Sequence, residues 1–203
     1  MPIWSWSAIS KLIYLFAPKM SERSATDSLT AKWWFCPRYA NGSVHEPSVS
    51  KLIYSHLNRD SVFFDIGANL GFFTILGGSI CKDRGSSHSF EMDPNLINLA
   101  MRSIILNENL GAIHLNCAAV SDKSGESVSF SPYQEGNPST NQLNIQTPDN
   151  QDHTQLRVLT VTIDDYCARN LVLPDLIKID IEGAETLAIP GCRRLWVKIT
   201  QSL

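Results

Sequence analysis

With 203 residues and an apolar content of 43%, the chain is long enough for one well-buried α/β domain, and a second full domain is not expected. A net charge of -3 and a pI near 5.9 give no basic footprint, which argues against nucleic acid as a partner. The five cysteines are scattered without a C-x-x-C pair, so neither a disulfide framework nor a zinc site is predicted. This cysteine usage is typical of a reducing, cytoplasmic compartment.

The first 42 residues are predicted to form a helical or irregular extension in front of the domain, which spans residues 43–203. The stretch Ile3–Ala17 is apolar, but it contains Lys11 and is short for a membrane span. Two interpretations remain open. One is a helix packed on the domain, which we favour, and the other is an interfacial helix that contacts a membrane surface.

A helix is predicted over Glu46–Leu57, with Pro47 in its first turn, and a buried strand begins at Val62. The run Asp65–Gly71 then reads as a strand end, a tight turn and a helix start. Backbone N–H groups at such a turn are expected to cradle a negatively charged ligand group.

The spacing of the glycines indicates which ligand this turn binds. A dinucleotide fingerprint, G-x-G-x-x-G, needs a bare second glycine where the pyrophosphate approaches the backbone, and Asn69 occupies that position here. Asparagine tolerates the left-handed conformation, but its side chain fills the space of a pyrophosphate. Asp65 can hold a ligand's ammonium or order the loop. S-adenosylmethionine carries an ammonium and a carboxylate, so the loop favours methyl transfer over hydride transfer.

The second strand is predicted over Ser86–Phe90 and ends at Glu91. In α/β nucleotide folds an acidic residue at this place accepts hydrogen bonds from ribose hydroxyls, and we favour that role for Glu91. The alternative is an acidic neighbour of the next helix. That helix is marked by Asp93 as its N-cap and Pro94 at its first position.

The third strand is predicted over Ala112–Cys117, and Asp122 follows it shortly. Asp122 can meet an adenine amino group or simply start a turn, and both readings stay open. Further strands are predicted at Val128–Phe130 and Val158–Ile163. The polar segment between them, residues 131–157, either covers a substrate or is surface disorder.

The strand Leu176–Asp180 leads into a second group of acidic residues, Asp180, Glu182 and Glu185. Clustered carboxylates beside a cofactor site favour proton transfer, so Asp180 or Glu182 is the candidate catalytic base. His45 is a second candidate, although an ordinary surface or capping histidine is the simpler interpretation. Two carboxylates alone are thin evidence for Mg²⁺, and no metal is predicted.

Taken together, these motifs resemble the FkbM family of methyltransferases. The resemblance rests on the segments 64–71, 90–91, 118–122, 162–165 and 177–185, in matching order and spacing. It implies a Rossmann-like methyltransferase sheet with helices on both faces, S-adenosylmethionine as donor, and a hydroxyl of a sugar, lipid-linked glycan or polyketide as acceptor. The residues assigned to the cofactor site are Asp65, Gly67, Ala68, Asn69, Gly71, Glu91 and Asp122, of which Ala68 and Asp122 come from the loop positions alone.

The family normally continues through further strands, whereas this chain stops 20 residues after Gly183. The final strands are therefore expected to be missing, which would leave an apolar edge beside the strand ending at Asp180 and favour pairing with another chain. Two other functions follow from the pattern. One is a catalytically silent cofactor-binding or interaction protein, and the other is a nicotinamide dehydrogenase that tolerates Asn69.

Overall fold

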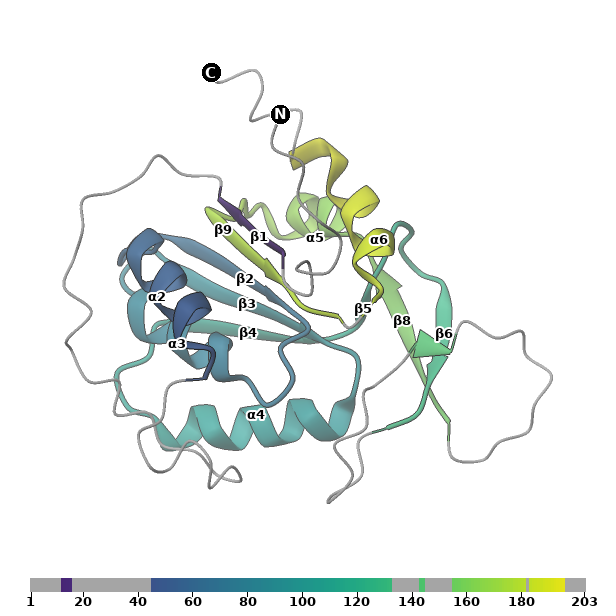
Figure 1. Cartoon of the computed structure of the whole chain (residues 1–203), viewed down its shortest axis with the longest axis horizontal. Coiled ribbons are helices and arrows are strands. Elements are labelled where there is room, and N and C mark those ends of the chain that lie inside the picture. Colours follow the sequence, from purple (N-terminus) through teal and green to yellow (C-terminus); the bar gives the residue numbers. More distant parts are fainter. Residues whose placement is uncertain (1–11, 16–44, 133–142, 145–154, 182, 196–203) are drawn as a thin grey trace.

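The computed structural model describes residues 12–15, 45–132, 143–144, 155–181 and 183–195 (Figure 1). Their helical elements are α2 (Pro47–His56), α3 (Phe72–Ile80), α4 (Pro94–Leu106), α5 (Ile163–Asn170), α6 (Glu185–Ala188) and the 3-10 helix η2 (Ile189–Cys192). Their strands are β1 (Leu12–Leu15), β2 (Val62–Ile66), β3 (Ser86–Glu91), β4 (Ala112–Cys117), β5 (Ala119–Val120), β6 (Ser127–Phe130), β7 (Leu143–Asn144), β8 (Leu156–Val161) and β9 (Leu176–Ile179).

Within the described residues, the main sheet has five strands in the order β1-β9-β2-β3-β4. Strands β9, β2, β3 and β4 are parallel to one another, and β1 is antiparallel to β9. From β2 the chain proceeds outward to β3 and β4 and later returns to the other side of β2 as β9. The strand order therefore reverses between β2 and β9, and in open α/β sheets ligands bind at the carboxyl ends of strands beside such a reversal.

A smaller sheet follows β4, with the order β5-β8-β6-β7 in the described part of the chain. Strand β5 is parallel to β8, and β6 is antiparallel to both of its neighbours. The strand predicted at Val158–Ile163 is shifted by two residues, since β8 ends at Val161. Thr162 then caps α5, its side chain accepting a hydrogen bond from the Asp165 N–H.

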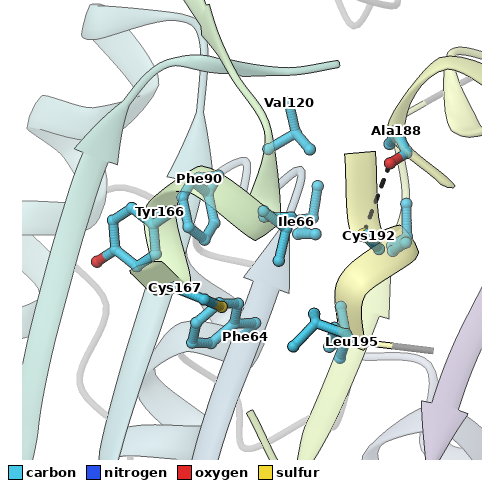
Figure 2. Close-up of a cluster of buried hydrophobic side chains, with 12 residues drawn as sticks. Phe64, Ile66, Phe90, Val120, Tyr166, Cys167, Ala188, Cys192 and Leu195 are labelled. Atoms are coloured by element: carbon cyan, nitrogen blue, oxygen red, sulfur yellow. Dashed lines mark hydrogen bonds between the residues drawn. The ribbon is translucent and has the colours of Figure 1, made fainter. Parts of the chain in front are cut away.

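Helices cover both faces of the main sheet, as predicted (Figure 1). Helices α2 and α3 bury one face through an apolar cluster that includes Ile53, Phe63 and Leu76. The opposite face carries a larger cluster beneath α5, α6 and η2, drawn in Figure 2. Its members are Phe64, Ile66, Phe90, Val120, Ile163, Tyr166, Cys167, Ile177, Ile179, Ala188, Cys192 and Leu195.

A polar network is buried beside this second cluster. The imidazole of His88 is 5% exposed, contacts the Tyr166 hydroxyl at 2.8 Å through Nδ1, and stacks on His114 with a centroid separation of 4.4 Å. Burial, and secondarily the neighbouring His114, lowers the pKa of His88 from 6.5 to about 4. His88 is therefore a neutral hydrogen-bonding residue of the core.

The N-terminal prediction needs correction. A helix was expected across Ile3–Ala17, but Leu12–Leu15 forms β1, and the remainder of that stretch lies outside the described residues. The expected uncovered edge beside β9 is also wrong, because β1 pairs with β9 from Leu12 opposite Ile179 to Leu15 opposite Leu176. Association with another chain stays a prediction. Among the described helices, none combines the length and apolar character needed to cross a membrane.

Candidate active site

The two motifs singled out in the sequence meet at the reversal between β2 and β9. Gly67 follows β2 with a φ of +76°, and a Cβ atom at this position would overlap the backbone carbonyl of Asp180, which follows β9. Gly71 has a φ of +82°, and a Cβ there would lie 2.9 Å from the Cβ of Ala100 in α4. Both glycines are thus required by backbone conformation and by close packing.

The backbone N–H groups of the glycine turn are all engaged within the protein. Those of Gly67 and Ala68 both donate to the carbonyl of Phe90, at 2.9 and 3.0 Å. The remaining three donations are Asn69 N–H to Glu91 Oε2 at 2.9 Å, Leu70 N–H to Asn69 Oδ1 at 2.8 Å, and Gly71 N–H to the Ala68 carbonyl at 2.8 Å.

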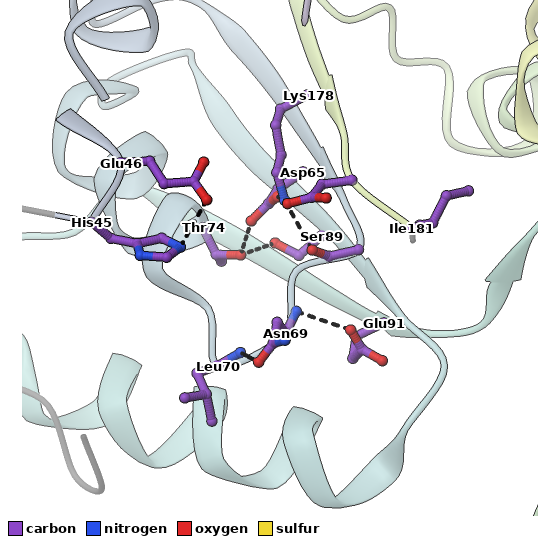
Figure 3. Close-up of polar contacts among 12 residues, drawn as sticks. His45, Glu46, Asp65, Asn69, Leu70, Thr74, Ser89, Glu91, Lys178 and Ile181 are labelled. Atoms are coloured by element: carbon purple, nitrogen blue, oxygen red, sulfur yellow. Dashed lines mark hydrogen bonds and ion pairs between the residues drawn. The ribbon is translucent and has the colours of Figure 1, made fainter. Parts of the chain in front are cut away.

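From Gly67 through Gly71, this arrangement differs from the anion cradle that the sequence predicted. A phosphate-binding loop presents several N–H groups to its ligand, whereas the groups from Gly67 through Gly71 are directed at protein acceptors. Asn69 has a φ of 52°, which confirms that asparagine is used here in the left-handed conformation. Its side chain folds back on the turn rather than leaving the space open (Figure 3).

Glu91 lies at the end of β3, next to the turn. Its two carboxylate oxygens accept the N–H groups of Asn69 and Asp93, at 2.9 and 3.0 Å, so Glu91 connects the glycine turn with the start of α4. The side chain is 7% exposed, and burial raises the pKa of its carboxyl, with the backbone hydrogen bonds opposing that shift. Each oxygen has a further lone pair with which it can accept a ligand hydroxyl.

Asp65 lies within a buried polar layer between the sheet and α3. One oxygen, Oδ2, accepts a hydrogen bond from the Thr74 hydroxyl at 2.8 Å, and Thr74 also contacts the Ser89 hydroxyl at 2.8 Å. The other oxygen, Oδ1, forms an ion pair with Lys178 Nζ at 3.1 Å. Asp65 is fully buried, and the cation that its carboxylate contacts is the ammonium of Lys178.

Lys178 is a site residue that the sequence analysis did not single out. It is 2% exposed, and its Nζ donates to the Gly67 carbonyl at 2.9 Å, lies 3.9 Å from Asp180 Oδ2, and sits 5.1 Å from the centroid of the Phe73 ring. Figure 3 shows its side chain directed toward Asp65. The available signal was a lone lysine in the otherwise apolar strand Leu176–Ile179, since a buried charge requires a partner.

The acidic group after β9 separates into different roles. Asp180 has a side chain that is 22% exposed and faces Lys178. Glu185 instead organises the turn, because its carboxylate accepts the N–H groups of Ile181 at 3.2 Å and Gly183 at 2.9 Å. Glu182 lies outside the described residues, and its proposed role as a base stays a prediction.

His45 lies just before α2 and beside α3, the helix that follows the glycine turn. Its ring contacts those of Phe72 and Phe73, at centroid separations of 5.3 and 5.5 Å, and its Nε2 lies 3.5 Å from a carboxylate oxygen of Glu46. Since Lys178 lies over the same Phe73 ring, His45 is one aromatic ring away from the Asp65 network. The side chain is 32% exposed.

Asp122 lies in an exposed turn after β5, where one of its carboxylate oxygens accepts the Ser121 hydroxyl at 3.2 Å. On the other side of β5, the Ala118 N–H donates to the Glu91 carbonyl at 3.1 Å and joins the chain between β4 and β5 to the end of β3. This geometry is that of a turn residue, and the suggested contact with adenine stays a prediction.

The mostly parallel sheet, with helices on both faces and polar residues at a strand-order reversal, defines an α/β protein of the Rossmann-like methyltransferase class. The sequence profile of the methyltransferase FkbM domain matches residues 65–201, more than half of the chain. The chain therefore belongs to the FkbM methyltransferase family, and the resemblance drawn from its motifs is confirmed. Comparison with curated proteins finds no match.

Proposed function

We propose that the protein transfers a methyl group from S-adenosylmethionine to a hydroxyl oxygen of a sugar, lipid-linked glycan or polyketide-like acceptor. The observation that carries this proposal is the engagement of every N–H group from Gly67 through Gly71 within the protein. A turn of this kind offers little to a pyrophosphate, and the groups around it are mainly acceptors.

The charge of the described site residues fits the proposed donor. Asp65, Glu91 and Asp180 contribute three carboxylates at the carboxyl ends of β2, β3 and β9, against the single ammonium of Lys178. A site with this balance favours a ligand that brings a cationic sulfonium, an ammonium and ribose hydroxyls. It disfavours a dinucleotide, whose two phosphates are negatively charged.

Within this proposal, Glu91 accepts the ribose hydroxyls through the lone pairs that remain on its carboxylate. Gly67, Ala68, Asn69 and Gly71 shape the turn against which the donor lies, with Asn69 in the left-handed conformation. Asp65 orders the turn through its contacts with Lys178 and Thr74 in the buried layer and does not touch the donor. Of the two roles that its position suggested, holding a ligand's ammonium and ordering the loop, the proposal gives Asp65 the second.

Asp180 is the proposed proton acceptor, because its carboxylate is partly exposed and lies beside the turn. The donor supplies a methyl group on a positively charged sulfur, which leaves as a neutral thioether with the electrons of the broken C–S bond. The chain's task is to align the acceptor oxygen with that bond and to take up the proton that the oxygen loses. His45 is the second candidate for this proton.

The experiment that tests the proposal is a methyl-transfer assay with S-adenosylmethionine labelled in its methyl group, offered with pools of glycans and other hydroxyl-bearing acceptors. Label in a base-stable ether product, formed much more slowly with Asp180→Asn, is the expected result. Binding of the donor with no transfer to any pool would favour a catalytically silent cofactor-binding protein. Label recovered only on nitrogen or carbon would contradict the hydroxyl acceptor.

A further inference from the structure

The backbone of Gly67 is held from both sides of the strand-order reversal. Its N–H donates to the Phe90 carbonyl on the β3 side, and its carbonyl accepts from Lys178 on the β9 side. The first hydrogen bond is between backbone groups and is available to any sequence with this sheet register. The second depends on the side chain at position 178 alone.

A lysine at position 178 is energetically unfavourable, because its charge is buried. Its strand neighbours Leu176, Ile177 and Ile179 are at most 1% exposed, and an apolar residue would satisfy the same strand without burying a charge. Buried ion pairs are often no more stabilising than apolar residues of similar size. A requirement for stability therefore does not explain the Lys178–Asp65 pair, whereas a requirement for geometry does.

We propose that Lys178 is the positioning residue of the site, and that its ammonium group fixes the Gly67 turn relative to Asp180. The contacts of Nζ span the Gly67 carbonyl at 2.9 Å, Asp65 Oδ1 at 3.1 Å and Asp180 Oδ2 at 3.9 Å. These three groups belong to the turn, to β2 and to the segment after β9. Lys178 thus couples the donor side to the proton-accepting side, an inference that rests on the proposed function.

Asp65 helps to hold Lys178 in this position. It balances the charge of Lys178 and limits where the ammonium can lie, while Thr74 anchors its other oxygen to α3. The Phe73 ring lies on a further side of the ammonium, 5.1 Å away. With these neighbours, the lysine has little freedom to leave the Gly67 carbonyl.

Lys178→Met keeps most of the length of the side chain but leaves Asp65 buried without its ion pair, so that variant alone can fail through misfolding. The informative variant is Lys178→Met combined with Asp65→Asn, which removes both charges together. Ser87→Ala is the control, since Ser87 is fully buried on the same face of the sheet and its hydroxyl donates to the Thr74 backbone carbonyl, at 3.3 Å. Each protein is studied by thermal melting, by amide hydrogen exchange of the peptide covering residues 66–71, and by calorimetric titration with S-adenosylmethionine.

The double variant is expected to melt close to the wild type, yet to exchange the 66–71 amides about tenfold faster and to bind S-adenosylmethionine about tenfold more weakly, the scale of one lost charge-assisted hydrogen bond. Ser87→Ala should change neither quantity. If the double variant keeps wild-type exchange and affinity, Lys178 merely balances Asp65 and the proposal is overturned. If the wild type itself binds no S-adenosylmethionine, the proposed function fails, while the exchange comparison still decides the role of Lys178.

Discussion

Replacing Glu91 by glutamine tests the link between the glycine turn and the cofactor. The carboxylate accepts the Asn69 and Asp93 N–H groups through separate oxygens, whereas an amide has one oxygen, so one N–H loses its acceptor. A hydrogen bond to a charged group is worth about 1.5 to 3 kcal/mol. Glutamine carries no charge, so the cost of burying the Glu91 carboxylate, which raises its pKa, disappears and offsets part of the lost hydrogen bond. The free energy of unfolding should therefore fall by about 1 to 2 kcal/mol.

The same substitution should weaken S-adenosylmethionine binding by about 10- to 100-fold, since the ribose hydroxyls also lose charged acceptors. Urea denaturation measures the first effect and calorimetric titration the second. Glu126→Gln is the control, because the Glu126 side chain is 53% exposed and lies in the turn before β6. A loss of stability with unchanged affinity would refute the reasoning, because it would make Glu91 a purely structural link between the turn and α4.

Gly67→Ala should lower the free energy of unfolding by more than Gly125→Ala does. Both positions have a positive φ, which costs about 1 to 2 kcal/mol for alanine, but only a Cβ atom at Gly67 would overlap another part of the backbone. Equal losses in urea denaturation would contradict this prediction. The free energy of unfolding should fall as the pH is lowered from 6.5 to 4, by at most about 1.4 kcal/mol per pH unit. In this range His88 is protonated in the unfolded chain but stays neutral in the folded protein, where burial lowers its pKa to about 4. His88→Gln should flatten that slope, and an unchanged slope would contradict the assignment to His88. Asp180→Asn should leave donor affinity nearly unchanged and slow transfer by about 10²- to 10⁴-fold, whereas full activity would exclude it as the base.

The parts of the fold that sequence predicted well are those specified locally. The run of apolar residues before Gly67 and the Asp93–Pro94 helix start each depend on neighbours within a few positions, and α4 indeed begins at Pro94 with Asp93 accepting the Asn95 N–H. The order and spacing of the motifs were enough to indicate the family, which the profile match confirms.

The errors concern contacts made across the sheet. Whether the turn N–H groups face a ligand depends on how β3 aligns with β2, because the Phe90 carbonyl takes two of them. The role of Lys178 depends on a partner 111 residues away in the chain, at Gly67. Leu12–Leu15 is too short for its apolar pattern to separate a strand from a helix, and its pairing with β9 decides the outcome.

The central claim is that the glycine turn serves a sulfonium donor rather than a dinucleotide. Parallel calorimetric titrations of the wild-type chain with S-adenosylmethionine and with NAD⁺ test it most directly. The acceptor-rich site and the internally engaged N–H groups predict saturable binding of S-adenosylmethionine and no measurable binding of NAD⁺. Tight binding of NAD⁺ with none of S-adenosylmethionine would contradict the account.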